Sequence, residues 1–497
     1  MNKNYEHYRA LKSKIADINN AMAVLSWDQE VNMPPDGFAF RAQQLSTLSG
    51  ILHDLSTSKE FEEVIAQLIN DETLSSKEKK NVHESFRIIT RDKKLPTEFI
   101  TKLSRLVSES YEAWIRARAA DDYEVFAPYL EKIVKMHREK AELIGYKDHP
   151  YDALLDDYDQ GLTTKELDRV FADVKVNLTA FVNKLKARPQ PDTSLLNGPF
   201  DKTKQMELCR VIATNLGYKW SSGRIDLSAH PFSTSFSPQD SHITTRVSET
   251  NLAESIWGTI HETGHAMYEQ GLPTSEYGLP SGEAISLAIH ESQSRLWENN
   301  VGKSWPFINA YWPTFQQFFP DNFKEHKALD FFKAINISEP NLIRINSDEV
   351  TYHFHILLRY EIEKGLIEGT YKVDGLDKVW NEKIKDYLGL EVPSAKDGIL
   401  QDIHWSHGSI GYFPTYSLGS FYAAQFFHFA NLAIPGLDKE IENKEFSNLL
   451  YWLRENIHQY GHIYTSQEIC KKVCGEELHY KYFDAYMHRK YGLVYNF

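Results

Sequence analysis

Apolar residues recur at three- and four-residue steps along most of the first 190 residues. Steps of this size return to one face of an α-helix, so each such stretch predicts an amphipathic helix. In the first stretch the apolar positions are Tyr8, Leu11, Ile15, Ile18, Met22 and Leu25. Further helices are predicted from about Arg41 and over residues 60–70, 78–91, 97–119, 124–145 and 164–187. No strand-like alternation of any length interrupts this pattern.

The rest of the chain keeps the helical pattern except in three places. Residues 188–199 are rich in proline and glycine and form a short linker-like stretch. Residues 223–247 combine many Ser and Thr with Phe, Ile and Val, which predicts a small β-hairpin or short sheet. Residues 394–419 are rich in glycine and aromatic residues and predict a long loop. The fold class that follows is mostly α.

The chain has ample material for a sizeable core, because 42% of its 497 residues are hydrophobic and 13% are aromatic. It contains no internal repeat and no low-complexity segment. We therefore predict a single domain over residues 1–497, made of an N-terminal helical part of about 1–190 and a second part of about 200–497.

Charge and cysteine content narrow the class of protein. The net charge of −14 argues against general affinity for nucleic acid or for anionic membranes. Three cysteines are too few for a disulfide scaffold and indicate a reducing compartment. Cys470 and Cys474 lie one helical turn apart, but no other thiol or histidine pair nearby completes a metal site. Without an apolar secretory segment or a run of about 20 apolar residues, we expect a soluble cytoplasmic protein.

Two histidines four residues apart are the strongest chemical signal in the sequence. The stretch 252–269 predicts a helix, and His261 and His265 then project from the same face, one turn apart. Two imidazoles so placed can both bind one Zn²⁺, which lowers the pKa of a coordinated water toward about 7. Glu262, directly after the first histidine, is placed to remove a proton from that water rather than to bind the ion.

The alternative is a chance pattern on an ordinary surface helix, since the chain contains 20 histidines. Chance matches rarely fall in a well-formed amphipathic helix with small residues beside the ligands. Here those small residues are Gly258, Gly264 and Ala266. The metal-site interpretation is therefore favoured.

A catalytic zinc site usually has three protein ligands and one open position, so a third ligand is needed. The stretch 284–299 predicts a second helix, and it contains Glu291, 26 residues after His265. The loop 272–282 is long enough to reverse the chain direction between the two helices. Glu291 is our choice of third ligand, and its neighbour His290 is the competitor. The alternative is that both are polar positions on an ordinary helix.

Six short motifs stand in the order typical of one known family. The chain resembles the thermostable-carboxypeptidase type of metallocarboxypeptidases, and the resemblance covers nearly its whole length. The first motif is Leu25-Ser26-Trp27-Asp28 with Met33-Pro34 and Arg41-Ala42. The others are His230-Pro231-Phe232, the pair His261–His265, His290-Glu291-Ser292-Gln293, Ile343-Arg344-Ile345-Asn346-Ser347-Asp348 and Gly398-Ile399-Leu400-Gln401-Asp402-Ile403-His404-Trp405.

The resemblance implies a fold, an activity and a cofactor. It implies two helical lobes flanking a deep substrate groove, as in the neurolysin and angiotensin-converting-enzyme groups, with the small sheet near the metal site. The implied enzyme is a peptidase that releases single residues from peptides with a free C-terminus. It is implied to use one Zn²⁺ or Co²⁺ per subunit and to form a homodimer. In this family the glutamate of H-E-S-Q is the third metal ligand, which favours Glu291 over His290.

One motif departs from the family pattern. The string D-x-R-x-T stands here as Asp240-Ser241-His242-Ile243-Thr244, with histidine in place of arginine. The motif is thought to help close one end of the substrate groove and limit peptide length. Histidine carries at most a partial charge near neutral pH, whereas arginine is permanently charged. The resemblance therefore leaves the peptide length limit of this chain open, and we expect His242 to contact substrate.

Further residues are candidates for work on the substrate. His404 and Tyr412 are expected to supply donors to the oxyanion, and Tyr416 is expected to contact substrate; plain packing is the alternative for either tyrosine. Arg344 is our candidate for binding the terminal carboxylate through paired hydrogen bonds; its alternative is an ion pair with Asp348.

The segment around His230 is expected to lie along the groove and pair with the substrate backbone, as edge strands do. His230 itself is a candidate substrate contact, and the alternative is that it only caps the strand.

Two other functions remain open on the sequence. A metallo-oligopeptidase or endopeptidase would use the same ion and the same base, and the motif H-E-x-x-H does not separate them. A non-catalytic helical binding protein on the same fold is the second alternative. The motifs at 290–293, 343–348 and 398–405 favour the carboxypeptidase, and the intact metal-binding residues argue against loss of catalysis.

Overall fold

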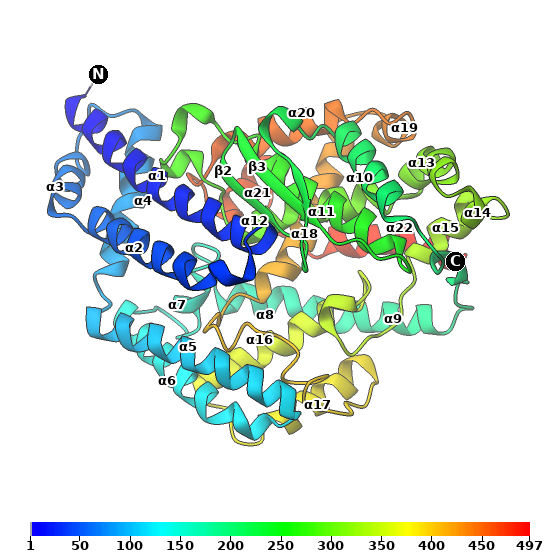
Figure 1. Cartoon of the computed structure of the whole chain (residues 1–497), viewed down its shortest axis with the longest axis horizontal. Helices are drawn as coiled ribbons and strands as arrows, with labels where there is room; N and C mark the ends of the chain where they lie inside the picture. The colour runs from blue at the N-terminus through cyan, green and yellow to red at the C-terminus, as the bar shows by residue number, and fades with distance from the viewer. Residues whose placement is uncertain (1) are drawn as a thin grey trace. The chain divides into compact units, whose positions relative to one another are not determined.

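α-Helices dominate the computed structural model, which describes residues 2–497 (Figure 1). The chain divides into two compact units, each built from three separate segments. Unit 1 comprises Met1–Thr90, Asp192–Ile335 and Tyr422–Leu478. Unit 2 comprises Arg91–Pro191, Asn336–Phe421 and His479–Phe497. The chain passes from unit 2 to unit 1 between residues 191 and 192, inside the linker-like stretch. At its other passages between the units the sequence has no linker-like stretch. The interpretation as a single domain stays a prediction.

Unit 1 contains the helix with the two histidines. Its first segment forms α1 (Lys3–Val31), α2 (Phe38–Ser56), α3 (Lys59–Leu68) and most of α4 (Ser76–Asp92). Its second segment forms α10 (Lys202–Leu216), α11 (Leu252–Glu269), α12 (Leu287–Arg295), α13 (Trp305–Phe318), α14 (Pro320–Phe323) and α15 (Ala328–Ile335). Its last segment holds most of α18 (Pro414–Ala433), followed by α19 (Leu437–Glu442), α20 (Ser447–Asn456) and α21 (Ser466–Cys474).

Unit 2 is built from helices and a long irregular segment. Its helices are α5 (Thr97–Ala120), α6 (Ala127–Ile144), α7 (Asp152–Leu155), α8 (Thr164–Asp173), α9 (Thr179–Lys186), α16 (Tyr352–Glu368), α17 (Leu376–Leu388) and α22 (Lys481–Tyr495). A π-helical turn at Val174–Leu178 joins α8 to α9, so the predicted helix 164–187 runs on with a local widening. Among the described residues, none of the helices is long and apolar enough to cross a bilayer.

The predicted short sheet is confirmed in unit 1. Its strands are β1 (Ile225–Leu227), β2 (Ser233–Ser237) and β3 (Asp240–Thr245), in the order β1-β3-β2. β3 pairs antiparallel with β2 and parallel with β1, and a register shift interrupts the β2–β3 ladder between Ser235 and Ser237. β3 and β2 both pack against α11, which places the sheet next to the helix with the two histidines.

Most predicted element boundaries hold, and two need correction. α11 spans Leu252–Glu269 as predicted, and Asn251 caps its first turn by accepting from the amide of Ala253. The helix predicted over 284–299 begins later, at Leu287, where Ser286 provides the cap. The predicted loop 394–419 is too long, because α18 begins at Pro414. Proline is favoured in the first turn of a helix, so Pro414 was a signal for this start. The prediction instead followed the glycine- and aromatic-rich composition of the stretch.

Candidate metal centre

His261, His265 and Glu291 come together in unit 1, two from α11 and one from α12. One potential ligand atom from each residue lies within 4.8 Å of the others. An oxygen of Glu291 is 3.6 Å from Nε2 of His261 and 3.5 Å from Nε2 of His265. The two helices therefore turn the carboxylate toward both imidazoles, as the choice of Glu291 over His290 requires.

A glycine lets the two helices approach closely at this point. Gly264 lies on α11 directly before His265. A Cβ atom at Gly264 would lie 2.7 Å from the backbone of Gln293 and of Ser294 on α12, closer than real contacts allow. The absence of a side chain at this position is what allows α12 to bring Glu291 within reach of the histidines.

The trio fits a divalent ion. Two ligand atoms about 2.0–2.1 Å from a tetrahedral Zn²⁺ are separated by about 3.4 Å. The distances of 3.6 Å and 3.5 Å between Glu291 and the two imidazoles are close to this separation. Imidazole nitrogens and a carboxylate oxygen are also the donor set that zinc prefers in catalytic sites. The residues present are thus suited to hold the metal that the sequence predicts.

Hydrogen bonds set the orientation of both imidazoles. Nδ1 of His261 lies 2.9 Å from a carboxylate oxygen of Glu298, so it carries the proton and donates it. Nδ1 of His265 lies 2.6 Å from Nδ1 of His290, whose Nε2 in turn lies 2.8 Å from Glu269. Nδ1 of His265 then donates to Nδ1 of His290, and Nε2 of His290 donates to Glu269. Both histidines then keep the lone pair on Nε2 available for an ion.

His290, the alternative to Glu291, therefore does not lie among the three grouped atoms. It lies beside Glu291 in sequence, but it contacts the back of His265 rather than joining the ligand atoms. Such outer partners fix the ring orientation of a ligand and raise its basicity. The geometry agrees with the choice of Glu291 over His290 made from the sequence.

Two cations keep the buried carboxylates ionised. Arg295 donates to Glu291 over 2.7 Å, and Lys303 donates to Glu298 over 2.7 Å. Burial opposes ionisation of both carboxylates, but Arg295, His261 and His265 lower the pKa of Glu291 by more than burial raises it. Lys303 and Arg295 likewise hold the pKa of Glu298 well below its ordinary value. One oxygen of Glu291 is fixed by Arg295, which leaves the other facing the imidazoles.

Glu262 is buried beside the cluster, and its carboxylate is not one of the three grouped atoms. It follows His261 directly on α11, and the residue is 7% exposed. Burial raises its pKa to about 7, helped by the charges of Glu291 and Glu298 and opposed by His261. A carboxylate with a pKa near neutrality is suited to take up and release a proton.

Unit 2 gathers His404 with the two predicted tyrosines. Nε2 of His404 lies 3.3 Å from the hydroxyl of Tyr416, and its ring centroid is 5.3 Å from that of Tyr412. Burial lowers the pKa of His404 to about 4, so its imidazole is neutral at pH 7. Its Nδ1 is buried and has no hydrogen-bond partner within the part of the chain that the structure describes.

Arg344 is buried in unit 2 and pairs with Asp402. Its Nε and Nη2 donate to one oxygen of Asp402 over 3.0 Å and 2.9 Å, and its Nη1 donates to the hydroxyl of Tyr352 over 2.8 Å. The alternative ion pair with Asp348 does not form, because that carboxylate accepts from the amides of Val350 and Thr351 instead. Binding of a carboxylate by Arg344 stays a prediction.

His230 and His242 lie near the sheet in unit 1. His230 is exposed and precedes β2. His242 on β3 contacts Asp240 over 2.7 Å, and its ring lies edge-on to Trp27 and to Phe236. Arg224, just ahead of β1, stacks its guanidinium over the same Trp27 ring at 5.0 Å. The departure from the usual arginine is therefore accommodated in an aromatic setting, and a substrate contact by either histidine stays a prediction.

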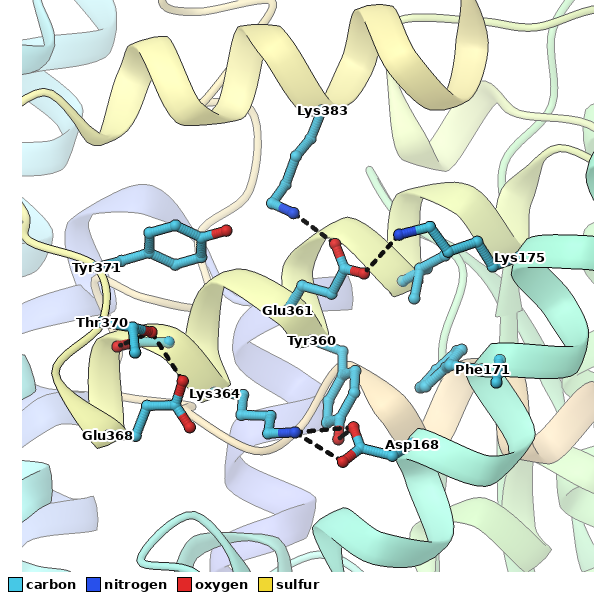
Figure 2. A pocket seen from close by; sticks show the side chains of 13 residues that line it. Asp168, Phe171, Lys175, Tyr360, Glu361, Lys364, Glu368, Thr370, Tyr371 and Lys383 are labelled. Carbon is cyan, nitrogen blue, oxygen red and sulfur yellow. Dashed lines mark hydrogen bonds and ion pairs between the residues drawn. The ribbon is translucent and has the colours of Figure 1, made fainter.

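A pocket of about 580 Å³ in unit 2 holds none of the predicted site residues (Figure 2). α8, α16 and α17 each contribute side chains to it, among them Asp168, Glu361 and Lys383. Figure 2 shows Lys383 and Lys175 pointing toward Glu361, while Lys364 binds Asp168 over 2.7 Å. The charged groups in this pocket thus neutralise one another, and it offers no arrangement that resembles the metal centre.

Several residues that shape the metal centre were missed by sequence reasoning. These are Glu269, Arg295, Glu298 and Lys303. Helical spacing offered a signal for two of them, because Glu269 and Arg295 lie four residues after His265 and Glu291 on the same helix faces. Glu298 and Lys303 had no such signal, since a π-helical turn at Leu296–Gly302 changes the spacing after α12.

Comparison with known proteins settles the family. The sequence model described as Carboxypeptidase Taq (M32) metallopeptidase matches residues 7–491. The chain belongs to this family. As an M32 metallopeptidase, it is a metallocarboxypeptidase, a hydrolase that acts on peptide bonds. The resemblance noted from the motifs and the mostly α fold are confirmed, and the carboxypeptidase interpretation is favoured over the two alternatives.

Named relatives agree with this membership over their whole length. Carboxypeptidase 1 of Bacillus subtilis is 37% identical over 487 residues, which is 98% of this chain and 97% of that protein. Thermostable carboxypeptidase 1 of Thermus thermophilus is 36% identical over 99% of each chain. The crystal structure of the M32 carboxypeptidase from Deinococcus radiodurans matches with a TM-score of 0.98, 33% identity and full coverage of both chains.

Proposed function

We propose that His261, His265 and Glu291 hold the metal ion of this metallocarboxypeptidase, and that Glu262 is its general base. The observation that carries this assignment is the approach of three ligand atoms to within 4.8 Å of one another in unit 1. The buried carboxylate of Glu262 is next to His261 in sequence but outside that trio. This division between ligands and base is the one that the H-E-x-x-H spacing predicts.

The chemistry follows from these groups. When bound, the ion lowers the pKa of water toward about 7 and polarises the scissile carbonyl. Glu262 takes the proton from the attacking water and later gives it to the leaving amine, so that one amino acid and a shortened peptide are released. Glu298 and the His290–Glu269 pair hold the two imidazoles in the orientation that leaves Nε2 available.

We assign the residues of unit 2 to the substrate. The neutral imidazole of His404 and the hydroxyl of Tyr412 are proposed to donate to the oxyanion, and Tyr416 to contact the peptide. The position of His404 supports this role, because the residue is only partly buried and its Nε2 lies 3.3 Å from the hydroxyl of Tyr416. Arg344 is proposed to bind the C-terminal carboxylate, with Asp402 fixing its guanidinium.

The remaining assignments rest on the sequence. His230 and His242 are proposed to contact substrate near β2, which lies at the edge of the sheet, where an extended peptide could pair. Zn²⁺ is the proposed ion because the donor set contains two imidazoles and one carboxylate, and Co²⁺ would occupy the same site. A homodimer and a cytoplasmic location are proposed, the latter because all three cysteines are free.

The exopeptidase assignment predicts a strict requirement for a free C-terminus. We expect a peptide to lose residues one by one from that end, giving a ladder of products by mass spectrometry. The amidated twin of the same peptide should be cleaved at least about 100-fold more slowly, because it lacks the carboxylate that an arginine would pair with. A parallel reaction with a metal chelator provides the control. Equal cleavage of both peptides at internal bonds would contradict the assignment and favour an endopeptidase.

A further inference from the structure

The segment that carries His404 and Tyr412 has no regular secondary structure, yet much of it is buried. It runs from Gly389, after α17, to Phe413, before α18. Trp405 and Ile410 within it are 4% and 1% exposed. A buried segment without helix or strand bonds must satisfy its polar groups through other partners. Those partners determine where its side chains point.

One buried carboxylate holds this segment at two places. Glu363 on α16 is completely buried. Its Oε1 accepts from the indole Nε1 of Trp405 over 2.8 Å, and its Oε2 accepts from the backbone amide of Gly411 over 2.9 Å. The hydroxyl of Tyr151 donates to the same Oε2. All these residues belong to unit 2.

The two anchor points lie directly beside the residues assigned to the substrate. Trp405 follows His404, and Gly411 precedes Tyr412. We propose that Glu363 is the positioning residue for His404 and Tyr412, fixing the segment at Trp405 and Gly411 and so the separation between the two side chains. This inference rests on the proposed function, in which His404 and Tyr412 serve the reaction. Glu363 itself has no access to a substrate, because its side chain is enclosed.

A carboxylate is the one group that fits this place. The indole N–H and the backbone amide can only donate, so both need an acceptor. Glutamine has the same shape, but one of its two positions is an NH₂ group. In either orientation of the amide, this group faces a donor, either Trp405 or Gly411. Glu363→Gln therefore removes one anchor while keeping the volume of the side chain.

Close packing at Gly411 leaves the backbone of the segment little room to move. Gly411 has a φ of +102°, and a Cβ atom there would lie 3.0 Å from the carbonyl oxygen of Leu154. The backbone of the segment thus rests directly on its neighbour at this point. A displaced amide at residue 411 would carry Tyr412 with it.

The ionisation state of Glu363 determines the pH at which the variants are compared. Burial raises the pKa of Glu363 to about 7, while Tyr151, the Gly411 amide, Trp405 and the charge of Arg359 lower it. The pKa values of Tyr151 and Tyr158, which face it, are raised, so these groups remain neutral. Assays at pH 8.5 therefore compare variants with the carboxylate ionised.

The test compares Glu363→Gln with the matched variant Tyr151→Phe in the full-length, zinc-loaded enzyme. Tyr151→Phe removes a donor from the same carboxylate but leaves both anchors of the segment. We expect Glu363→Gln to lower kcat on the order of 10- to 100-fold with KM and zinc content unchanged, since small displacements of reacting groups have effects of this size. Tyr151→Phe should keep kcat within about threefold. Hydrogen exchange should rise in Glu363→Gln within residues 398–413.

The outcomes separate this inference from the function on which it rests. The variants His404→Ala and Tyr412→Phe are measured in parallel. If both lose activity while Glu363→Gln keeps its kcat, the positioning role is overturned and the proposed function stands. If both keep full activity, the roles of His404 and Tyr412 are wrong. Equal losses in Glu363→Gln and Tyr151→Phe would indicate general damage to the core and also overturn the inference.

A second variant serves if Glu363→Gln does not fold. Trp405→Phe keeps an aromatic ring but lacks the indole N–H, so only the anchor beside His404 is lost. We expect a smaller fall in kcat than for Glu363→Gln, about three- to tenfold, with KM unchanged. An unchanged kcat in a folded Trp405→Phe enzyme would contradict the inference.

Discussion

Glu262→Gln is expected to lower kcat by about 10²- to 10⁴-fold without loss of the bound ion, which is the range for removal of a general base. Glutamine has the shape of glutamate but cannot accept a proton from water at neutral pH. Because the carboxylate of Glu262 is not among the three ligand atoms, its replacement should leave the site intact for metal. Kinetics on a peptide substrate, together with the metal content of the same preparation, measure both properties.

A matched control lies on the same helix. Glu254→Gln changes a carboxylate in the first turn of α11 that accepts from the surface residue Arg246 and, over 3.4 Å, from Asn251. This variant should keep both kcat and metal content. Activity of Glu262→Gln equal to that of the parent, with a full complement of metal, would show that another group is the base.

Glu291→Gln is expected to weaken metal binding by more than about 100-fold and to abolish activity at low metal concentration. Changes to residues that only orient a ligand cost 10- to 100-fold in affinity, so removal of a charged ligand should exceed that range. Metal content after dialysis against a competing chelator measures the affinity, and added metal should restore part of the activity. Arg295 keeps a carboxylate partner in this variant, because it also contacts Glu298 over 3.3 Å.

The control for this change is Glu283→Gln, an exposed carboxylate shortly before α12. It should retain metal and activity, since it has no part in the trio. Full metal retention by Glu291→Gln would mean that the third ligand is another residue. His290 would then be the first one to replace, because it already contacts His265.

Local patterns explain why the ligand helix was predictable. The apolar positions of α11 repeat with the helical period, and its predicted bounds match the structure. Helical spacing alone then places His261 and His265 on one face. The choice between His290 and Glu291 needed more than helical spacing, because the two residues are neighbours on one helix. The family resemblance favoured Glu291, and in the structure the close packing of α12 against Gly264 accompanies the approach of its carboxylate to both imidazoles.

Partners distant in sequence were not predictable from local patterns. Arg344 was considered with Asp348, four residues away, but it pairs with Asp402, 58 residues away. Glu298, which orients His261, lies 37 residues from it. Ion pairs of this kind are set by tertiary packing, and a helix-spacing rule applies only to residues on one helix. For the same reason, local patterns did not predict the contacts of Glu363 with Trp405 and Gly411, which lie 42 and 48 residues further along the chain.

Anomalous diffraction from crystals loaded with Zn²⁺ tests the central claim most directly, because data collected at the zinc absorption edge locate the ion itself. The arrangement of His261, His265 and Glu291 predicts one strong peak about 2.0–2.2 Å from Nε2 of both histidines and from an oxygen of Glu291. A crystal with zinc bound only at other residues, and no peak at this trio, would contradict the assignment of the metal centre.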